Sequence, residues 1–345
     1  MKTNVWKINQ LADGCSQLEE AAALLKKNEV VAFPTETVYG LGANAKSDEA
    51  LKKIFTAKGR PSDNPLIIHI AERAQLDELV RDVPDVAVAL MDAFWPGPLT
   101  LVLRKKSGLS DIATAGLDTV AIRMPDHPIA LKLIQEANLP IAAPSANLSG
   151  KPSPTTAKHV QKDLTGRISG IVDGGETGVG VESTVVDCTE AIPVILRPGG
   201  VTKEEIERIV GEIKEDTALH NKEEAPKAPG MKYTHYAPEA PFILVDGSPA
   251  FIQSFVDEKK SAGRTVGVLT TAENADFYRA DSVIPCGERE RLSTVAAGIY
   301  DALRAFDESG VDMIFGEVFP KEGIGEAIMN RLLKAAGHTL IKERQ

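Results

Sequence analysis

Cysteine is scarce in this sequence of 345 residues, and the three that occur, Cys15, Cys188 and Cys286, lie far apart. An odd number at such spacing argues against a disulfide framework and fits reduced thiols in a cytosol. The sequence opens without an apolar signal core, and no apolar run approaches the ~20 residues that cross a bilayer. We therefore expect a soluble cytoplasmic protein with no membrane segment.

Positive charge is also in deficit. Lys and Arg total 39 against 49 Asp and Glu, a formal net charge of -10. Neutralising phosphates takes clustered cations, so a basic nucleic-acid coat is not the first expectation. The six histidines form no pair at helical spacing and no cysteine accompanies them, which argues against a structural zinc site. We expect no metal ligands from side chains.

Several common catalytic motifs are missing as well. No Ser-His-Asp order, Gly-x-Ser-x-Gly elbow or helical pair of metal-binding acids occurs. The glycine-rich stretch 174–187 lacks the Gly-Lys-Ser/Thr ending of a P-loop. The groups that remain are cations, hydroxyls and backbone amides, which stabilise negative charge and position substrates. Phosphoryl or nucleotidyl transfer mostly requires these two functions.

The composition that is present, 43% hydrophobic and 26% charged, is ordinary globular usage. At about 150 residues per domain, the length predicts two domains. Near 203–232 a stretch that begins as an amphipathic helix becomes charged, proline-containing and poor in large apolar residues. We therefore expect a catalytic domain at 1–210, a linker at 211–240 and a C-terminal domain at 241–345.

The N-terminal part alternates helical and strand patterns. Helices are predicted at 16–27, with Ser16 as the N-cap, and at 48–57. Short apolar runs, several ending in proline or glycine, predict strands at 30–34, 65–70, 99–105, 119–125, 140–145, 170–175 and 183–189. Loops at strand ends are where α/β proteins commonly place their chemistry.

The C-terminal part has four strand-like segments separated by helical ones, at 242–247, 265–270, 281–286 and 311–319. Within 289–308 apolar residues recur at three- and four-residue spacing, which marks one buried helix face. This alternation predicts a small, mostly parallel, doubly wound sheet of the Rossmann-like kind. Fold-level reasoning alone favours a structural or regulatory domain.

Two segments carry most of the chemical signal. In KGRPSDNPLIIHI, Lys58 and Arg60 stand in a loop that is fixed by prolines and by the apolar strand that follows. An arginine fork suits phosphate or carboxylate, while lysine acts as a point charge. The segment PIAAPSANLSGKPSPTT, 140–156, can present backbone N–H groups and serine hydroxyls to a ligand. Taken singly, Lys58 and Arg60 could also be ordinary solvated cations. The segment 140–156 could likewise be an ordinary Ser/Pro turn region.

Two arginines and one aromatic segment add to this signal. Arg123 in RMP and Arg197 in LRPGG follow apolar strands, where sheets bind ligands and where strand-end salt bridges also form. The segment PGMKYTHYAP, 229–238, lies in the expected linker but is unusually rich in aromatic residues. Docking back over a site would explain them, and so would a hydrophobic tether.

In order and spacing, these segments resemble the threonylcarbamoyl-AMP synthase family in its longer, two-domain form. The matching text is FPTETVYGLGA, KGRPSDNPLIIHI, WPGPLTLVL, AIRMP, PSANLSGKPSPTT, STVVD, LRPGG and THYAP. The match runs from about residue 13 to residue 238. It implies an α/β fold: a YrdC-like twisted-sheet catalytic domain with a concave site, followed by the C-terminal domain.

The resemblance also implies an activity. The family condenses L-threonine, bicarbonate and ATP into threonylcarbamoyl-AMP and pyrophosphate, with Mg2+ on the ATP phosphates. A separate transferase system then moves the threonylcarbamoyl group onto an adenosine next to the tRNA anticodon. In that scheme the enzyme need not hold the RNA itself.

Site residues follow from the resemblance, position by position. L-threonine would be held by Thr37, His69, Arg123, Ser183 and the backbone at Ala143. ATP would be bound by Lys58, Arg60, Asn64, Thr119, Ser145, Ser153, Arg197 and Tyr236. Lys58 and Arg60 would be the catalytic cations, and Tyr236 would form part of a lid.

Two alternatives stay open. One is a related carbamoyl-adenylate-forming enzyme of hydrogenase maturation, which would require acylphosphatase and zinc-finger segments; the missing Cys pairs argue against it. The other is an RNA-binding module, since an acidic protein can carry a local basic groove. The sequence lacks the basic runs with interleaved aromatics that such a module uses.

Overall fold

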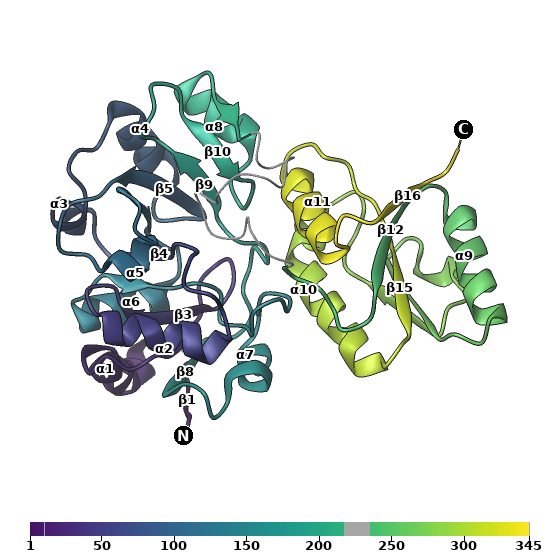
Figure 1. The fold of residues 1–345 in the computed structure, drawn as a ribbon, viewed down its shortest axis with the longest axis horizontal. Coiled ribbons are helices and arrows are strands. Elements are labelled where there is room, and N and C mark those ends of the chain that lie inside the picture. The colour runs from purple at the N-terminus through teal and green to yellow at the C-terminus, as the bar shows by residue number, and fades with distance from the viewer. Residues whose placement is uncertain (10, 217–234, 345) are drawn as a thin grey trace. The chain divides into compact units, whose positions relative to one another are not determined.

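The computed structural model describes residues 1–9, 11–216 and 235–344. The chain divides into two compact units (Figure 1). Described residues of the first unit fall in Met1–Ser149, Pro154–Gly178 and Glu182–Lys232, and those of the second in Gly150–Ser153, Val179–Val181 and Tyr233–Gln345. Two short pieces of the N-terminal part thus belong to the second unit. Most of the linker expected at 211–240 lies outside the described residues.

The described part of the first unit is built on an eleven-stranded sheet in the order β1-β8-β2-β3-β7-β4-β6-β5-β9-β10-β11. Its strands are β1 (Asn4–Lys7), β2 (Val31–Phe33), β3 (Gly40–Asn44), β4 (Ile67–His69), β5 (Leu99–Arg104), β6 (Thr119–Arg123), β7 (Ile141–Ala142), β8 (Gly170–Asp173), β9 (Thr184–Asp187), β10 (Val194–Arg197) and β11 (Lys214–Glu215). Parallel pairs such as β4 with β6 mix with antiparallel pairs such as β5 with β6.

Helices join these strands. They are α1 (Leu11–Lys26), α2 (Asp48–Lys58), η1 (Arg73–Gln75), α3 (Leu76–Leu79), α4 (Asp85–Phe94), α5 (Asp111–Thr114), α6 (Pro128–Ala137), α7 (Ala157–Leu164) and α8 (Lys203–Val210). Helix α1 begins five residues before the predicted start, so Ser16 lies inside the helix and the N-cap prediction was wrong. Leu11 already packs against the core, and such tertiary packing outweighs a local capping signal.

Strand alternation separates two cores in this unit. On β2, Val31 and Phe33 face a core that contains residues of α1 and α6, whereas Ala32 faces a core with residues of α2, α4, α7 and α8. Successive side chains of a strand point to opposite faces of the sheet. The sheet is therefore covered by helices on both faces in the region around β2.

The sheet face that packs against α1 and α6 around β2 has a different kind of core farther along the sheet. Under β4, β6, β5, β9 and β10 a separate small cluster forms from Ile67, Val102, Ala121, Val185 and Leu196. We call it the strand-only cluster, because every buried member comes from a strand. The opposite face of the same strands is packed against the larger helical core, through residues such as Ile68 and Ile122.

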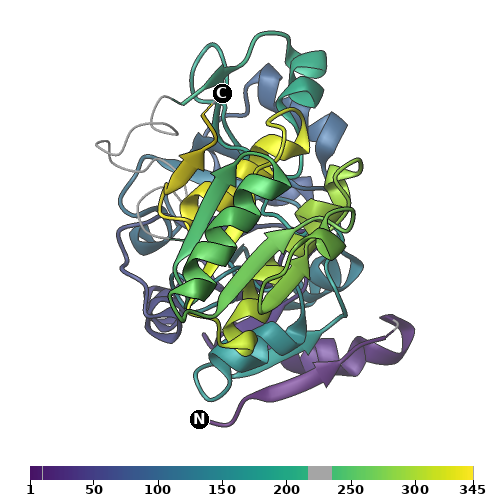
Figure 2. The same ribbon diagram turned by 90° about the vertical axis from the view of Figure 1, so that its right-hand side faces the viewer.

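The described part of the second unit has a five-stranded, all-parallel sheet in the order β14-β13-β15-β12-β16. Its elements are β12 (Phe242–Asp246), α9 (Pro249–Ser261), β13 (Val266–Thr270), η3 (Ala275–Phe277), β14 (Ser282–Pro285), α10 (Leu292–Ser309), β15 (Met313–Glu317), α11 (Ile324–Ala335) and β16 (Leu340–Lys342). Figures 1 and 2 show α9 on one face and α10 and α11 on the other. The predicted doubly wound, Rossmann-like sheet is confirmed.

Two cysteine side chains are described, and both are buried. Cys188 and Cys286 are free thiols, and burial raises the pKa of each to about 12. They therefore stay protonated and unreactive near neutral pH. None of the helices in the described ranges combines the length and apolar character needed to cross a membrane.

Candidate active site

Three neighbouring strands bring polar side chains into one row. His69 is the last residue of β4 and Arg123 the last of β6, and the two lie opposite each other in the parallel pair. Arg123 also lies opposite Thr100, the second residue of β5. Adjacent strands run ~4.8 Å apart, and laterally paired residues share a face. The three side chains therefore form a row across β4, β6 and β5, which we call the polar row.

Alternation fixes the face on which the polar row lies. His69 comes two residues after Ile67, and Arg123 two residues after Ala121. Residues two apart in a strand point the same way, and both apolar residues belong to the strand-only cluster. The polar row therefore lies on the same face as that cluster, and all three of its side chains are buried.

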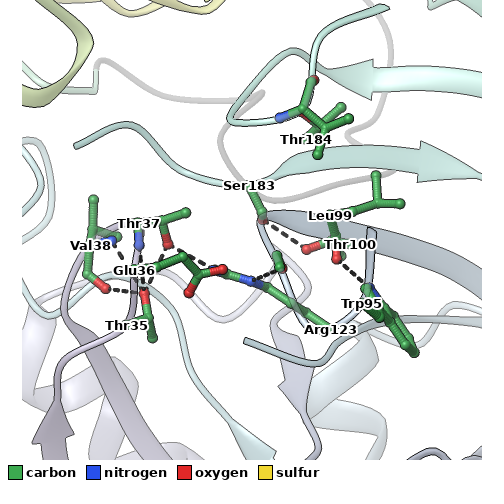
Figure 3. Close-up of polar contacts among 12 residues, drawn as sticks. Thr35, Glu36, Thr37, Val38, Trp95, Leu99, Thr100, Arg123, Ser183 and Thr184 are labelled. Carbon is green, nitrogen blue, oxygen red and sulfur yellow. Dashed lines mark hydrogen bonds and ion pairs between the residues drawn. The ribbon is translucent and has the colours of Figure 1, made fainter. Parts of the chain in front are cut away.

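Ser183 and Arg197 extend the polar row to β9 and β10. Ser183 directly precedes β9, and its hydroxyl lies 2.8 Å from that of Thr100 (Figure 3). In β10 a register shift after Ile195 places Arg197 opposite Val185 of the strand-only cluster. Such a β-bulge re-aims a side chain. The Arg197 guanidinium donates to the Ser183 carbonyl at 2.9 Å and to its hydroxyl at 3.2 Å.

A tight turn between β2 and β3 supplies the residues facing Arg123. The Thr35 hydroxyl accepts from the backbone N–H of Thr37 at 3.2 Å and of Val38 at 3.3 Å, and donates to the Val38 carbonyl at 2.6 Å. A threonine hydroxyl can stabilise a turn in this way by bonding to the backbone two or three residues on. Figure 3 shows that the turn directs Glu36 and Thr37 toward Arg123.

Arg123 is held by three contacts. Its Nε donates to the Gly97 carbonyl at 3.2 Å, and its Nη1 donates to the Thr37 hydroxyl at 2.9 Å. Its Nη2 lies 2.6 Å from the Glu36 carboxylate. The guanidinium is planar and has a fixed fork of donors. Gly97 and Thr37 thus orient the fork, and its remaining side meets a carboxylate.

His69 is a neutral imidazole at physiological pH. Burial, and secondly the Arg123 guanidinium, lower the pKa of His69 to about 3. The ring Nδ1 lies 3.3 Å from the Ile67 carbonyl, and the ring meets Phe33 edge to face at 6.1 Å. A neutral imidazole has one donor and one acceptor nitrogen. His69 can therefore form hydrogen bonds with a ligand without adding positive charge beside Arg123.

Lys58 ends α2 and is tied to the serine-rich loop. Its ammonium donates to the carbonyls of Ser145, at 2.5 Å, and Asn147, at 2.7 Å. The Lys58 carbonyl in turn accepts from the Ser149 N–H at 2.9 Å. Gly59 follows with φ of 61°, a conformation that favours glycine and ends the helix. The predicted phosphate-binding lysine and the predicted hydroxyl-rich loop are thus brought together.

Asn64 and Arg60 lie in the loop before β4. Arg60 Nη2 reaches the Asn64 carbonyl only at 3.5 Å, a marginal hydrogen bond. The Asn64 side chain is fully buried, and neither its amide oxygen nor its amide nitrogen has a hydrogen-bond partner among the described residues. Buried amides are nearly always satisfied. This orphaned amide therefore indicates a position for a ligand or an ordered water.

The predicted residues Thr119 and Ala143 lie at different distances from Arg123. Thr119 begins β6, and four residues at ~3.3 Å each place it about 13 Å from Arg123. Ala143 follows β7, and its N–H donates to the Ile67 carbonyl at 2.9 Å, next to His69 on β4. Ala143 is thus near the polar row, and Thr119 lies at the other end of the strand.

Ser153 and Tyr236 belong to the second unit. Tyr236 has a positive φ of 66°, and its ring stacks on Tyr300 at 5.3 Å, with the Arg331 guanidinium 5.6 Å from its centroid. Tyr300 and Arg331 belong to the same unit as Tyr236. The ATP contacts predicted for Ser153 and Tyr236, and the lid role of Tyr236, stay predictions.

Sequence reasoning missed two residues of this site, Thr100 and Glu36. Thr100 is the one hydroxyl in an otherwise apolar strand up to Leu103, and it shares the face of Val102. That break in the apolar run was the available signal. Glu36 lies inside the FPTETVYG segment, but its pairing with Arg123 joins residues far apart in the chain and leaves no local signal. Across the described ranges, no group of three or more His, Cys, Asp or Glu could hold a metal ion.

Comparisons with known proteins cover the whole chain. A family model described as telomere recombination matches residues 23–199, and one described as threonylcarbamoyl-AMP synthase, C-terminal domain, matches residues 201–337. The threonylcarbamoyl-AMP synthase of Bacillus subtilis is 61% identical, covering 99% of this chain and 100% of the relative. That of Pyrococcus abyssi is 52% identical, covering 93% and 94%.

A solved structure agrees with these matches. The crystal structure of Pyrococcus abyssi Sua5 complexed with L-threonine is similar over 100% of both chains, with a TM-score of 0.93 and 48% sequence identity. The resemblance deduced from the ordered motifs is confirmed over both units. The chain belongs to the threonylcarbamoyl-AMP synthase family.

Proposed function

We propose that this protein condenses L-threonine, bicarbonate and ATP to L-threonylcarbamoyladenylate and pyrophosphate. As a member of its family it is an enzyme of the nucleotidyltransferase type. The observation that carries the residue-level proposal is the buried Arg123 guanidinium, which two neighbours orient and which has a carboxylate on its remaining side. Such a group is suited to bind the carboxylate of an amino acid.

L-threonine would lie along the polar row. Arg123 would bind its carboxylate, and the hydroxyls of Thr37 and Ser183 would lie on either side. Neutral His69 can accept or donate one hydrogen bond there. The backbone at Ala143 is close to His69 through its bond to the Ile67 carbonyl. These residues share one face of the sheet, so one small ligand could contact them together.

ATP would be bound by the loop residues around α2 and β10. The Lys58 ammonium fixes the carbonyls of Ser145 and Asn147, which shapes the serine-rich loop and places positive charge beside it. The orphaned Asn64 amide offers a donor and an acceptor to the nucleotide. Arg60 and Arg197 would bind phosphates as forks. Thr119, Ser153 and Tyr236 complete the proposed set.

The chemistry needs positioning and charge stabilisation. The threonine amine and bicarbonate give a carbamate and water. A carbamate oxygen then attacks the α-phosphorus of ATP while the bond to pyrophosphate breaks in line. Lys58 and Arg60 would stabilise the developing charge. Mg2+ bound to the ATP phosphates would neutralise the leaving group, and in this proposal it arrives with the nucleotide.

The adenylate is a mixed anhydride, so a second enzyme must use it quickly. We propose that a tRNA threonylcarbamoyl transferase system in the cytoplasm takes the product and modifies an adenosine next to the anticodon. This protein would then take part in tRNA modification without holding the RNA.

The decisive experiment measures pyrophosphate release from ATP with Mg2+, bicarbonate and one amino acid at a time. Release should depend on both L-threonine and bicarbonate, and the product should have the mass of threonylcarbamoyl-AMP. Omitting bicarbonate is the matched control. Release that proceeds equally well without threonine would overturn the proposal.

A further inference from the structure

The carboxylate of Glu36 has no hydrogen bond among the described residues. Its side chain is 14% exposed, and both carboxylate oxygens are buried. Neither oxygen forms a hydrogen bond with any described group. Its ion-pair partner is Arg123, at 2.6 Å between Nη2 and Oε1. This contact is short, but it lacks the alignment of a hydrogen bond.

Such an environment is costly for a carboxylate. An ionised carboxylate offers about four lone-pair sites, and a buried one is normally both paired and hydrogen-bonded. Glu36 has the pairing and lacks the hydrogen bonds. The nearby His127 does not supply a hydrogen bond to Glu36, because its buried Nδ1 has no hydrogen-bond partner among the described residues. A donor group is therefore missing beside Glu36.

The backbone holds Glu36 in this position. The hydrogen bonds of the Thr35 hydroxyl close the turn on both sides of Glu36. The next residue, Thr37, is itself bonded to Arg123. Figure 3 shows the Glu36 carboxylate directed from this turn toward the guanidinium. The local structure thus places an acidic group beside the basic group that is proposed to bind a carboxylate.

We propose that Glu36 is the subsite for the α-ammonium group of the amino-acid substrate. This inference rests on the proposed function, in which Arg123 binds the substrate's carboxylate. Without substrate, Glu36 and Arg123 neutralise each other. When the zwitterion binds, its carboxylate takes the place of Glu36 at Arg123, and its ammonium supplies the donors that Glu36 lacks.

The exchange leaves the net charge of the buried site unchanged. A zwitterion adds one charge of each sign, and each finds an opposite partner. A ligand with the carboxylate alone would displace Glu36 from Arg123 and leave two carboxylates together, which is unfavourable in a buried site. Glu36 therefore selects α-amino acids against the corresponding acids without an amine.

The test compares two ligands on the full-length protein by titration calorimetry. One ligand is L-threonine, and the other is 3-hydroxybutyrate, which keeps the carboxylate and the hydroxyl but has no amine. The variants are E36Q, which keeps the size and removes the charge, and E36D, which keeps the charge. E29Q is the matched control, since Glu29 is a half-buried glutamate before β2 that pairs with Lys53 at 2.8 Å.

In E36Q the affinity for L-threonine should fall about 10- to 100-fold, the range expected for one charge-assisted hydrogen bond. The affinity for 3-hydroxybutyrate should rise, because no carboxylate remains beside Arg123. E36D should still reject 3-hydroxybutyrate, and E29Q should behave like the wild type. Thermal melting of each variant checks that it is folded.

Three results would overturn the inference. They are an unchanged L-threonine affinity in E36Q, an equal loss for both ligands, and E36D binding 3-hydroxybutyrate as well as E36Q does. An equal loss would mean that Glu36 has only a structural role. If the wild type failed to bind L-threonine, the proposed function would fall and this inference with it. Wild-type binding with an unaltered E36Q affinity would remove only the role of Glu36.

Discussion

The two halves of one sheet face differ in what their inward side chains do. Around β2, Val31 and Phe33 pack against residues of α1 and α6 and form a core. Around β6, the same alternation gives only the strand-only cluster and then the polar row. We call these the covered half and the strand-only half. The two-residue period of a strand decides on which face of the sheet a side chain lies. Whether that position becomes part of an apolar core or of the polar row depends on whether helices pack over it.

The largest effect is expected in the strand-only half. R123Q removes the positive fork of the polar row and leaves Glu36 without its ion-pair partner. Adenylate formation should fall about 1,000-fold, because the proposed charge contact between the buried guanidinium and the substrate carboxylate is lost. Threonine-dependent pyrophosphate release is the measurement. R104Q is the control, since Arg104 is exposed on the neighbouring strand β5 and should be replaceable at no cost in rate.

A substitution in the covered half should lower the stability of the protein and leave its catalytic rate nearly unchanged. Leu133 on α6 is fully buried in the core that faces β2. L133A should lower the free energy of unfolding by about 2–5 kcal/mol, the usual cost of a cavity in a core. Urea denaturation measures this. The rate per folded molecule should stay near that of the wild type, and a loss of rate as large as that of R123Q would erase the contrast between the two halves.

The buried His69 should give the strand-only half a dependence on pH. Its folded pKa of about 3 lies below the ordinary value of 6.5. As the pH falls from about 6.5 toward 3, the unfolded chain takes up a proton that the folded site refuses. His69 therefore lowers stability by up to about 1.4 kcal/mol per pH unit in that window and has no such effect above it.

The variant H69Q should remove this contribution. Unfolding free energies measured between pH 7 and pH 4 should fall less steeply for H69Q than for the wild type. The comparison cancels the titration of groups common to both proteins. Parallel curves would mean that His69 takes up a proton in the folded protein as readily as in the unfolded one.

The smallest effect concerns one hydrogen bond inside the polar row. T100V keeps the shape of the side chain and removes the 2.8 Å contact between the Thr100 and Ser183 hydroxyls. The affinity for L-threonine should fall about 3- to 10-fold, in keeping with about 1 kcal/mol for one neutral hydrogen bond. Calorimetric titration measures it. T114V is the control, since Thr114 bonds instead to Lys105.

Local patterns in the sequence were enough to find most strands but missed β1, β3, β11 and β16. The apolar runs that became β2, β4 and β6 are short, uninterrupted and bounded by breaks. In contrast, β3 reads GLGAN, and glycine is poor in strands. Gly42 is required there because a Cβ would come within 2.8 Å of Phe33 and 2.9 Å of Ile141. The backbone pairing of this segment with β2 and β7, which no local pattern reveals, makes it a strand.

The residues of the candidate site also fall into those that local sequence indicates and those that it does not. Arg123 and His69 could be selected because each ends a strand within a recognisable motif. The bond from Lys58 to the carbonyls of the serine-rich loop joins positions more than eighty residues apart, as does the pairing of Arg123 with Glu36. Local sequence gives the residue types, whereas these partners depend on the order of strands in the sheet.

The register of the polar row has one more consequence. Backbone pairing between the strands, and not contact between the side chains, sets the positions of His69, Arg123 and Thr100. The spacing of the three side chains is therefore a property of the sheet. Replacing one of these side chains leaves the other two in place. Deleting a single residue inside β6 would instead turn the following side chains to the other face, so that the guanidinium would enter the helical core. The arrangement of the polar row should therefore survive the exchange of single side chains far better than changes in the length of its strands.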